Sequence, residues 1–271
     1  MSFFADTTVV ATGPDAAGLG HFDTHLRPGW DIGGNANGGY MLAIVARAIA
    51  LHCERPDPIT ITAHYLNPGK VGPAEVFCET VKSGKRFATT HAQLRAFDRP
   101  LLQVLATFGD LSQATEAPEM IDGRPPDLPE PEACRPSDSD EGIAPPFLGK
   151  VDLRLHPDDA GFRRGEPSGE ACIRGWFRLP ESEQVSPWAM LLGLDAFPPT
   201  IFNARLPMGW APTVELTCHI RARPAPGWLR ARFTTRFVSG GFLEEDGELW
   251  DSEGRLVAQS RQLGLVPRTV A

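Results

Sequence analysis

The chain has 271 residues, which is enough for one large domain or two ordinary ones. Its net charge of -8 argues against a nucleic-acid partner, because proteins that bind phosphate backbones usually present a basic face. No run of about 18 apolar residues occurs and residues 1–12 do not read as a secretory signal, so we expect no membrane span and no export.

The cysteines and histidines give no sign of disulfides or of a metal site. Five cysteines are scattered without a CxxC pair, which predicts free thiols in a reducing compartment, and the cytoplasm is the expected location. His21 and His25 have no third ligand at the spacing of a zinc site. The glycine run at residues 33–39 lacks the GxGxxG pattern of a dinucleotide site. We therefore expect no metal and no cofactor.

The first organised stretch covers residues 30–110. The glycine run opens a predicted helix at residues 40–52, in which apolar residues recur at helical spacing and alanines keep the other faces small. This composition is typical of a helix that is surrounded and buried by other elements. Four strand-like runs follow, separated by turn signals, at residues 59–66, 74–81, 86–97 and 101–108.

A different composition begins at residue 111. Residues 111–146 are rich in proline and acids and have hardly any periodic hydrophobicity. We interpret this segment as a linker that follows the surface or is partly disordered.

The second stretch repeats the order of the first. Residues 171–179 form a predicted strand, and Ser186 and Pro187 then supply the N-cap and the first-turn proline of a helix at residues 188–196. Four more strands are predicted at residues 213–221, 228–238, 242–251 and 256–266.

The two stretches share local sequence as well as element order. Residues 81–87 match residues 237–243, and residues 102–109 align with residues 257–264 without a gap. This pattern indicates an internal duplication of an α+β unit, in which a long helix lies across a curved antiparallel sheet. We predict an N-terminal unit at residues 1–110, the linker at 111–146 and a C-terminal unit at 147–271.

The segments that carry this duplication resemble the double-hotdog acyl-CoA thioesterase II family. In the first half they are residues 33–40 (GGNANGGY), 65–69 (YLNPG) and 83–86 (SGKR), and in the second half residues 194–199 (LDAFPP) and 257–262 (VAQSRQ). The resemblance implies two tandem hotdog folds fused in one chain and the hydrolysis of an acyl-CoA to free acid and CoA, as in fatty acid metabolism. It also implies a homo-oligomer, because hotdog sheets commonly pair.

The resemblance also implies the catalytic residues. In that family an Asp on the second helix, a Gln on the last strand and a Thr on the strand after the helix hold and activate a water. The Asp corresponds to Asp195 and the Gln to Gln262. Counting without a gap places Val214 at the Thr position, and Thr213 fits only with a shift of one residue, which reverses the face of a strand. Thr213 and Thr217 are both candidates.

The position of Asp195 is unusual even when the family resemblance is set aside. It continues the apolar stripe of its predicted helix and lies near the helix C-terminus, where burial and the helix dipole both disfavour a carboxylate. Either the residue has a function, or the helix end is exposed and Asp195 meets water or Arg205. Gln262 lies on a face of small residues, where it can bind a water or an acid, or satisfy a backbone group at the sheet edge.

The thioester carbonyl needs hydrogen-bond donors, which the start of a helix provides. Asn35, Asn37, Gly38 and Gly39 at the start of the first helix are the expected substrate-binding residues, with a plain entry turn as the alternative. The other functions that this sequence allows are a non-catalytic acyl or acyl-CoA binder and a hotdog hydratase, although no helix-start Asp is followed closely by His.

Overall fold

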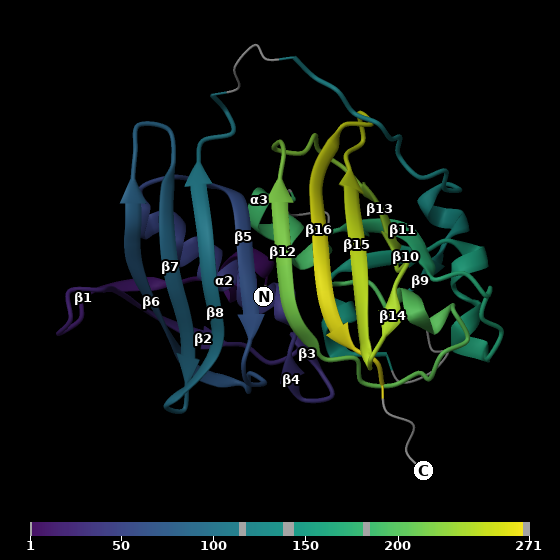
Figure 1. Ribbon diagram of the computed structural model, residues 1–271, viewed down its shortest axis with the longest axis horizontal. Coiled ribbons are helices and arrows are strands. Elements are labelled where there is room, and N and C mark those ends of the chain that lie inside the picture. Colours follow the sequence, from purple (N-terminus) through teal and green to yellow (C-terminus); the bar gives the residue numbers. More distant parts are fainter. Residues whose placement is uncertain (1, 114–117, 138–143, 181–184, 268–271) are drawn as a thin grey trace.

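One continuous antiparallel sheet organises the molecule (Figure 1). The computed structural model describes residues 2–113, 118–137, 144–180 and 185–267. The sheet has 14 strands in the order β1-β2-β6-β7-β8-β5-β12-β16-β15-β13-β11-β10-β9, and β14 pairs with β15 off this path. Among the described residues, no helix is long and apolar enough to cross a membrane.

The first half supplies one end of the sheet and its long helix. Its elements are α1 (Phe3–Asp6), β1 (Val10–Pro14), β2 (Gly20–Leu26), α2 (Gly38–Cys53), β5 (Asp57–Tyr65), β6 (Gly72–Ser83), β7 (Ala88–Ala96) and β8 (Arg99–Gly109). A separate hairpin joins β3 (Asp31–Ile32) to β4 (Asn35–Ala36). The predicted helix and four strands of this half are confirmed, while α1, β1 and β2 were not predicted.

The second half supplies the other end of the sheet. Its strands are β9 (Arg135–Pro136), β10 (Asp152–Leu155), β11 (Cys172–Arg178), β12 (Thr213–Ile220), β13 (Leu229–Thr234), β14 (Val238–Ser239), β15 (Phe242–Trp250) and β16 (Leu256–Leu265). Its helices are α3 (Pro187–Gly193) and the 3-10 turns η1 (Pro131–Ala133), η2 (Pro146–Lys150), η3 (Pro157–Asp159), η4 (Gly161–Arg164) and η5 (Thr200–Phe202). The five strands predicted for this half are present.

Helix α2 is buried on nearly every side. Its N-cap is Asn37, whose side chain accepts a hydrogen bond from the N–H of Tyr40, and its C-cap is Glu54, which has a left-handed conformation. Residues from Gly39 to Ile49 are buried with the exception of Arg47. Because α2 contacts strands β5 to β8 on one side and α3 on another, its small and apolar residues are all used in packing.

Helix α3 is shorter than predicted. It begins as expected, with the Ser186 side chain accepting a hydrogen bond from the Ala189 N–H and Pro187 in the first turn. It ends at Gly193 and not at residue 196, and the N–H of Asp195 instead pairs with the Leu192 carbonyl in a tighter turn. Asp195 therefore lies just beyond the helix, which frees its side chain to approach α2.

Strands β5 and β12 join the two halves into one sheet. They pair antiparallel, with Ala63 opposite Leu216 and Thr62 opposite Thr217. Figure 1 shows α2 and α3 on the same face of the sheet, close to this junction. The junction thus brings together elements that are more than 100 residues apart in the chain.

The segment predicted as a linker is partly built into the sheet. Within it, β9 pairs with β10, and Cys134 is buried. The Trp176 indole N–H on β11 donates to the Pro129 carbonyl at 2.9 Å. Residues 129–136 of this segment are therefore packed against the second half, in contrast to the linker that the composition predicts, because a proline here supplies a carbonyl acceptor.

Candidate active site

A cavity of about 760 Å³ lies between the N-terminus of α2, the turn after α3 and strands β12, β15 and β16. Most of its lining is apolar, and much of that is aromatic, including Phe147, Phe162, Phe197, Phe202 and Trp210. The lining also includes the polar side chains of Asn37, Asp195, Thr213, Glu245 and Gln262. Apolar walls with a few convergent polar groups are typical of a small-molecule site.

Asp195 is held at the N-terminus of α2. Its Oδ2 accepts a hydrogen bond of 2.7 Å from the Gly39 N–H and one of 3.0 Å from Asn37 Nδ2. The same Asn37 side chain caps α2 through its Oδ1, which accepts from the Tyr40 N–H at 2.9 Å. No described residue bonds to the other carboxylate oxygen, Oδ1. One oxygen is therefore fixed by the positive end of the helix, and the other is available to a ligand in the cavity.

Gly39 is needed because the two helices approach closely. A Cβ atom at this position would lie 2.8 Å from both the Leu191 carbonyl oxygen and the Leu192 Cα, and 2.9 Å from the Asp195 Cβ. Only glycine fits beside backbone atoms at this distance. The close approach is what places the Gly39 N–H within reach of Asp195.

The surroundings of Asp195 change its acidity. Burial raises the pKa of Asp195 from 3.8 to about 6, although hydrogen bonds from Gly39, Asn37 and the Gly38 backbone act in the opposite direction. A carboxylate with a pKa close to neutrality is ionised at pH 7 and is a stronger base than an exposed aspartate.

Gln262 and Thr213 meet across strands β16 and β12. The Gln262 Nε2 donates a hydrogen bond of 2.7 Å to the Thr213 Oγ1, and both residues line the cavity. A bulge between Thr213 and Glu215 shifts the register of β12 by one residue. Bulges re-aim side chains, and this one turns Thr213 toward Gln262.

Thr217 lies elsewhere. Its hydroxyl bonds to the Thr62 hydroxyl at 2.9 Å and donates to the Glu215 carboxylate, and it does not line the cavity. Asn35, one of the expected substrate-binding residues, belongs to β4 and lines the cavity. Its Oδ1 accepts a hydrogen bond of 2.7 Å from Lys70 Nζ.

Two cavity residues were missed in the sequence. Glu245 is the cross-strand partner of Gln262, and Tyr65 packs its ring edge against Gly38. The Tyr65 hydroxyl is buried without a hydrogen-bond partner among the described residues, and burial raises its pKa well above the usual value. In the structure Glu245 shares the buried phase of β15 with Leu243, Gly247 and Leu249, and the flanking acids at residues 244 and 246 hide this alternation in the sequence.

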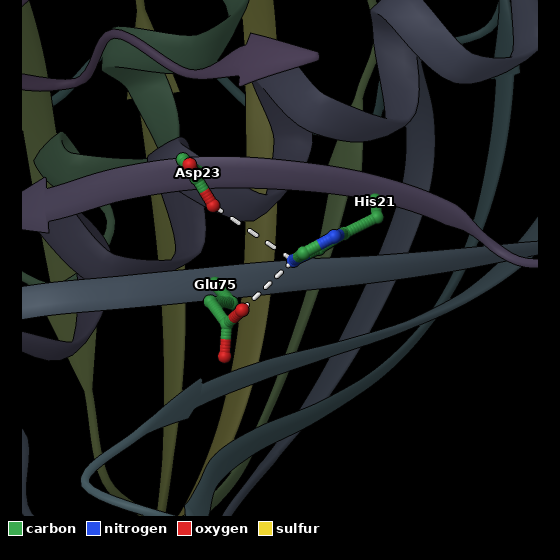
Figure 2. Close-up of side chains that lie close together, drawn as sticks. All are labelled: His21, Asp23 and Glu75. Atoms are coloured by element: carbon green, nitrogen blue, oxygen red, sulfur yellow. Dashed lines mark hydrogen bonds and ion pairs between the residues drawn. The ribbon is translucent and has the colours of Figure 1, made fainter. Parts of the chain in front are cut away.

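A second group of titratable side chains lies away from the cavity, on β2 and β6 (Figure 2). His21 Nε2 is 2.9 Å from the Glu75 carboxylate and 3.8 Å from that of Asp23. Both carboxylates are more than half exposed, and the His21 ring stacks on Phe77. Hydrogen bonding and exposed ion pairing account for this arrangement.

Comparison with known proteins places the chain in a family. The acyl-CoA thioesterase N-terminal domain matches residues 26–109, and the acyl-CoA thioesterase C-terminal domain matches residues 131–266. A candidate thioesterase II of Thermobifida fusca YX is 32% identical, with a TM-score of 0.86 over 98% of this chain and 97% of that one.

Two further solved structures share the fold. A hotdog-fold protein of Alicyclobacillus acidocaldarius is 20% identical, with a TM-score of 0.85 over 99% of this chain and 98% of that one. An acyl-CoA thioesterase II of Mycobacterium marinum is 17% identical, with a TM-score of 0.71 over 99% of each chain. The protein therefore has a hotdog fold. It belongs to the acyl-CoA thioesterase family and is a thioester hydrolase.

Proposed function

We propose that this protein hydrolyses an acyl-CoA to free acid and CoA in the cavity at the α2 N-terminus, with Asp195 as the general base. The observation that carries this proposal is the position of Asp195. One of its carboxylate oxygens is fixed by the Gly39 N–H and the Asn37 side chain, and the residue lines a cavity large enough for an acyl group.

The reaction needs a positioned water. We assign its orientation to Gln262 and Thr213, because their hydrogen bond leaves the Gln262 carbonyl oxygen and the Thr213 hydroxyl proton for a ligand. Asp195 Oδ1 takes a proton from the water as its oxygen attacks the thioester carbon. The C–S bond then breaks, and the CoA thiolate leaves with the electron pair and recovers the proton from Asp195. Thr217 has no part in this scheme.

The substrate-binding assignments divide into two kinds. Asn37 and Gly39 act on the substrate through Asp195, since their donors already bond to its carboxylate, and the Gly38 backbone also acts on Asp195. Asn35 and Gly38 line the cavity directly, and we assign the Asn35 side chain to contacts with the substrate near the thioester. The apolar and aromatic walls suit an acyl chain.

The arrangement of elements supports a double hotdog. Each half has one buried helix on a run of antiparallel strands, and β5 and β12 connect them. We propose units at residues 1–110 and 147–271 joined by 111–146, with one reactive site per chain because the first half has no acid between Gly38 and His52. We further propose a cytoplasmic homo-oligomer, which light scattering would detect as a mass above 29.5 kDa.

A panel of acyl-CoAs with a thiol-trapping dye tests the reaction. We expect CoA release from at least one chain length, and loss of about 10²–10⁴-fold in rate for Asp195→Asn, which removes the base. Stabilisation by acyl-CoA without turnover, unaffected by Asp195→Asn, would instead indicate a binding protein.

A further inference from the structure

A second carboxyl group occupies the same cavity as Asp195. Glu245 lies on β15 directly opposite Gln262 on β16, so the two side chains project from the same face of the sheet. Only 7% of Glu245 is exposed, and the residue lines the cavity. An acid at an inward strand position is costly to bury, and this one is placed among the groups proposed to handle the water.

Glu245 is held in place in the same manner as Asp195. Its Oε2 accepts a hydrogen bond of 2.8 Å from the backbone N–H of Thr200, the first residue of η5. The Thr200 hydroxyl is in turn bonded to that of Thr235 at 2.6 Å, which fixes the turn against the sheet. No described residue bonds to the second oxygen, Oε1. One oxygen is again anchored and the other is open to a ligand.

The thioester carbonyl still requires a donor. The Gly39 N–H at the start of α2, which the sequence suggested for this purpose, is already bonded to Asp195, as is the Asn37 amide. A neutral carboxyl group can donate a hydrogen bond, and an apolar site keeps such a group protonated. Glu245 is a buried carboxyl group in the cavity that can do so.

The charges around Glu245 favour its neutral form. Asp195, in the turn after α3, and Glu244, its neighbour on β15, both act on it as negative charges, while η5 and β16 present the uncharged Thr200 and Gln262. Arg163 on η4 is the one basic residue among the described residues that line the cavity. Burial is the main cause that raises the pKa of Glu245 from 4.5 to about 7; hydrogen bonding to Thr200 acts in the opposite direction, and the negative charges of Asp195 and Glu244 add to the increase.

We propose that Glu245 is a second catalytic carboxyl group, which donates a hydrogen bond from Oε1 to the thioester carbonyl oxygen. The role rests on the proposed hydrolysis at Asp195. As the water attacks and Asp195 takes its proton, the carbonyl oxygen gains negative charge, and the Glu245 proton stabilises that charge without leaving Glu245. When the C–S bond breaks, the carbonyl re-forms and the hydrogen bond weakens again. Asp195 acts ionised and Glu245 acts protonated.

The pH dependence of kcat/KM separates this role from a structural one. Activity requires ionised Asp195 and protonated Glu245, so kcat/KM of the wild type should follow a narrow bell-shaped pH profile. Its two apparent pKa values describe the coupled pair and not either residue alone. Glu245→Gln keeps an acceptor for the Thr200 N–H and presents an N–H donor that does not titrate. This variant should retain hydrolysis and lose the alkaline limb, so that its rate stays high above about pH 8.

Two more variants complete the test. Glu245→Leu removes the donor and should lower kcat by roughly 10²-fold with a smaller effect on KM, as expected for a group that acts in the transition state. Glu248→Gln, on the outer face of the same strand where Glu248 pairs with Arg232, is the matched control and should keep the wild-type profile.

The outcomes are distinct. An alkaline limb that survives in Glu245→Gln overturns the role of Glu245 and leaves the hydrolysis at Asp195 standing. If Glu245→Leu does not fold, the profile of Glu245→Gln alone decides. Failure of the wild type to hydrolyse any acyl-CoA overturns the proposed function, and the role of Glu245 with it.

Discussion

The backbone N–H of Gly39 donates a hydrogen bond of 2.7 Å to the Asp195 carboxylate across 156 residues of sequence. This contact joins the start of the helix in the first half to the turn after the helix in the second half. Together with the Asn37 side chain, this N–H stabilises the charge of a buried carboxylate at the α2 terminus. The candidate active site is therefore a product of the pairing between the two halves.

The Asn37 amide is one of the groups that lower the pKa of Asp195. Asn37→Ser keeps a good N-cap for α2 but cannot reach the carboxylate, so the variant should fold normally. Loss of this hydrogen bond removes an influence that lowers the pKa of Asp195, and the pKa should rise above about 6. The acidic limb of kcat/KM should move to higher pH by about one to two units, since a hydrogen bond to a charged group contributes roughly 1.5–3 kcal/mol. An unchanged limb would show that Asn37 has no such influence.

Asp195 should lower the stability of the fold at neutral pH. Its folded pKa of about 6 lies above the ordinary 3.8, so the folded state binds this proton more tightly than the unfolded state does. The contribution of this proton to the free energy of unfolding is fully present below pH 3.8. It is lost as the pH rises through about 6, the folded pKa. Asp195→Asn should therefore be more stable than the wild type above pH 6, by up to about 3 kcal/mol.

Urea unfolding at two pH values tests this expectation. The difference between Asp195→Asn and the wild type should be largest near pH 8 and should shrink toward about pH 3, where Asp195 is mostly protonated in both states. The opposite trend would mean that the hydrogen bonds from α2 outweigh the cost of burial.

The sequence predicted the elements better than the details of the site. Hydrophobic periodicity located α2 and strands β5 to β8, and the Ser186–Pro187 pair located the start of α3, because these signals are local. Asp195 and Gln262 were both singled out, and both line one cavity. The bulge at Val214 leaves no mark in residue type, since it is decided by pairing with β16, and counting along the strand therefore could not choose Thr213 over Thr217.

Glu245 was missed for a related reason. Three acids in succession, residues 244–246, hide the alternation of β15, and the inward phase becomes visible only once the register with β16 is known. The strands β1 and β2 were missed because glycine and polar residues interrupt them, and they exist through pairing with β6.

Thr213 and Thr217 form a natural pair of test positions on β12. Thr213→Val removes the hydroxyl that bonds to Gln262, so we expect a fall in kcat of roughly tenfold or more, as for loss of a group that positions the water. Thr217→Val removes a hydroxyl that bonds to Thr62 outside the cavity and should leave kcat unchanged. Equal losses of kcat in both variants would mean that the substitutions act by disturbing β12 and not by removing a group from the site.

The two tyrosines of the chain should respond oppositely to loss of the hydroxyl. The Tyr40 hydroxyl accepts from the Arg27 N–H at 3.1 Å and donates to the Asp6 carbonyl at 2.9 Å, whereas that of Tyr65 is buried without a partner. Tyr40→Phe should cost about 1–3 kcal/mol of unfolding free energy, and Tyr65→Phe should be neutral or stabilising. Urea unfolding compares them, and equal destabilisation would contradict the difference in hydrogen bonding.

The contact between α2 and α3 should tolerate no side chain at Gly39. In Gly39→Ala, the added methyl group would meet the Leu191 carbonyl oxygen and the Leu192 Cα at 2.8 Å. Backbone atoms yield less readily than the end of a flexible side chain, so the helices must separate, at a cost of about 1–3 kcal/mol or more. Separation also carries Asp195 away from its donors, and hydrolysis should fall with stability.

Gly149→Ala in η2 is the matched control, because a Cβ there meets nothing within 4 Å. It should change the unfolding free energy by less than about 0.5 kcal/mol. Equal stability and equal activity of the two variants would mean that the helices can separate at Gly39 without cost. In that case the 2.7 Å bond to Asp195 would not depend on their close approach. A large effect confined to Gly39→Ala would instead tie the acidity and position of Asp195 to the helix contact itself.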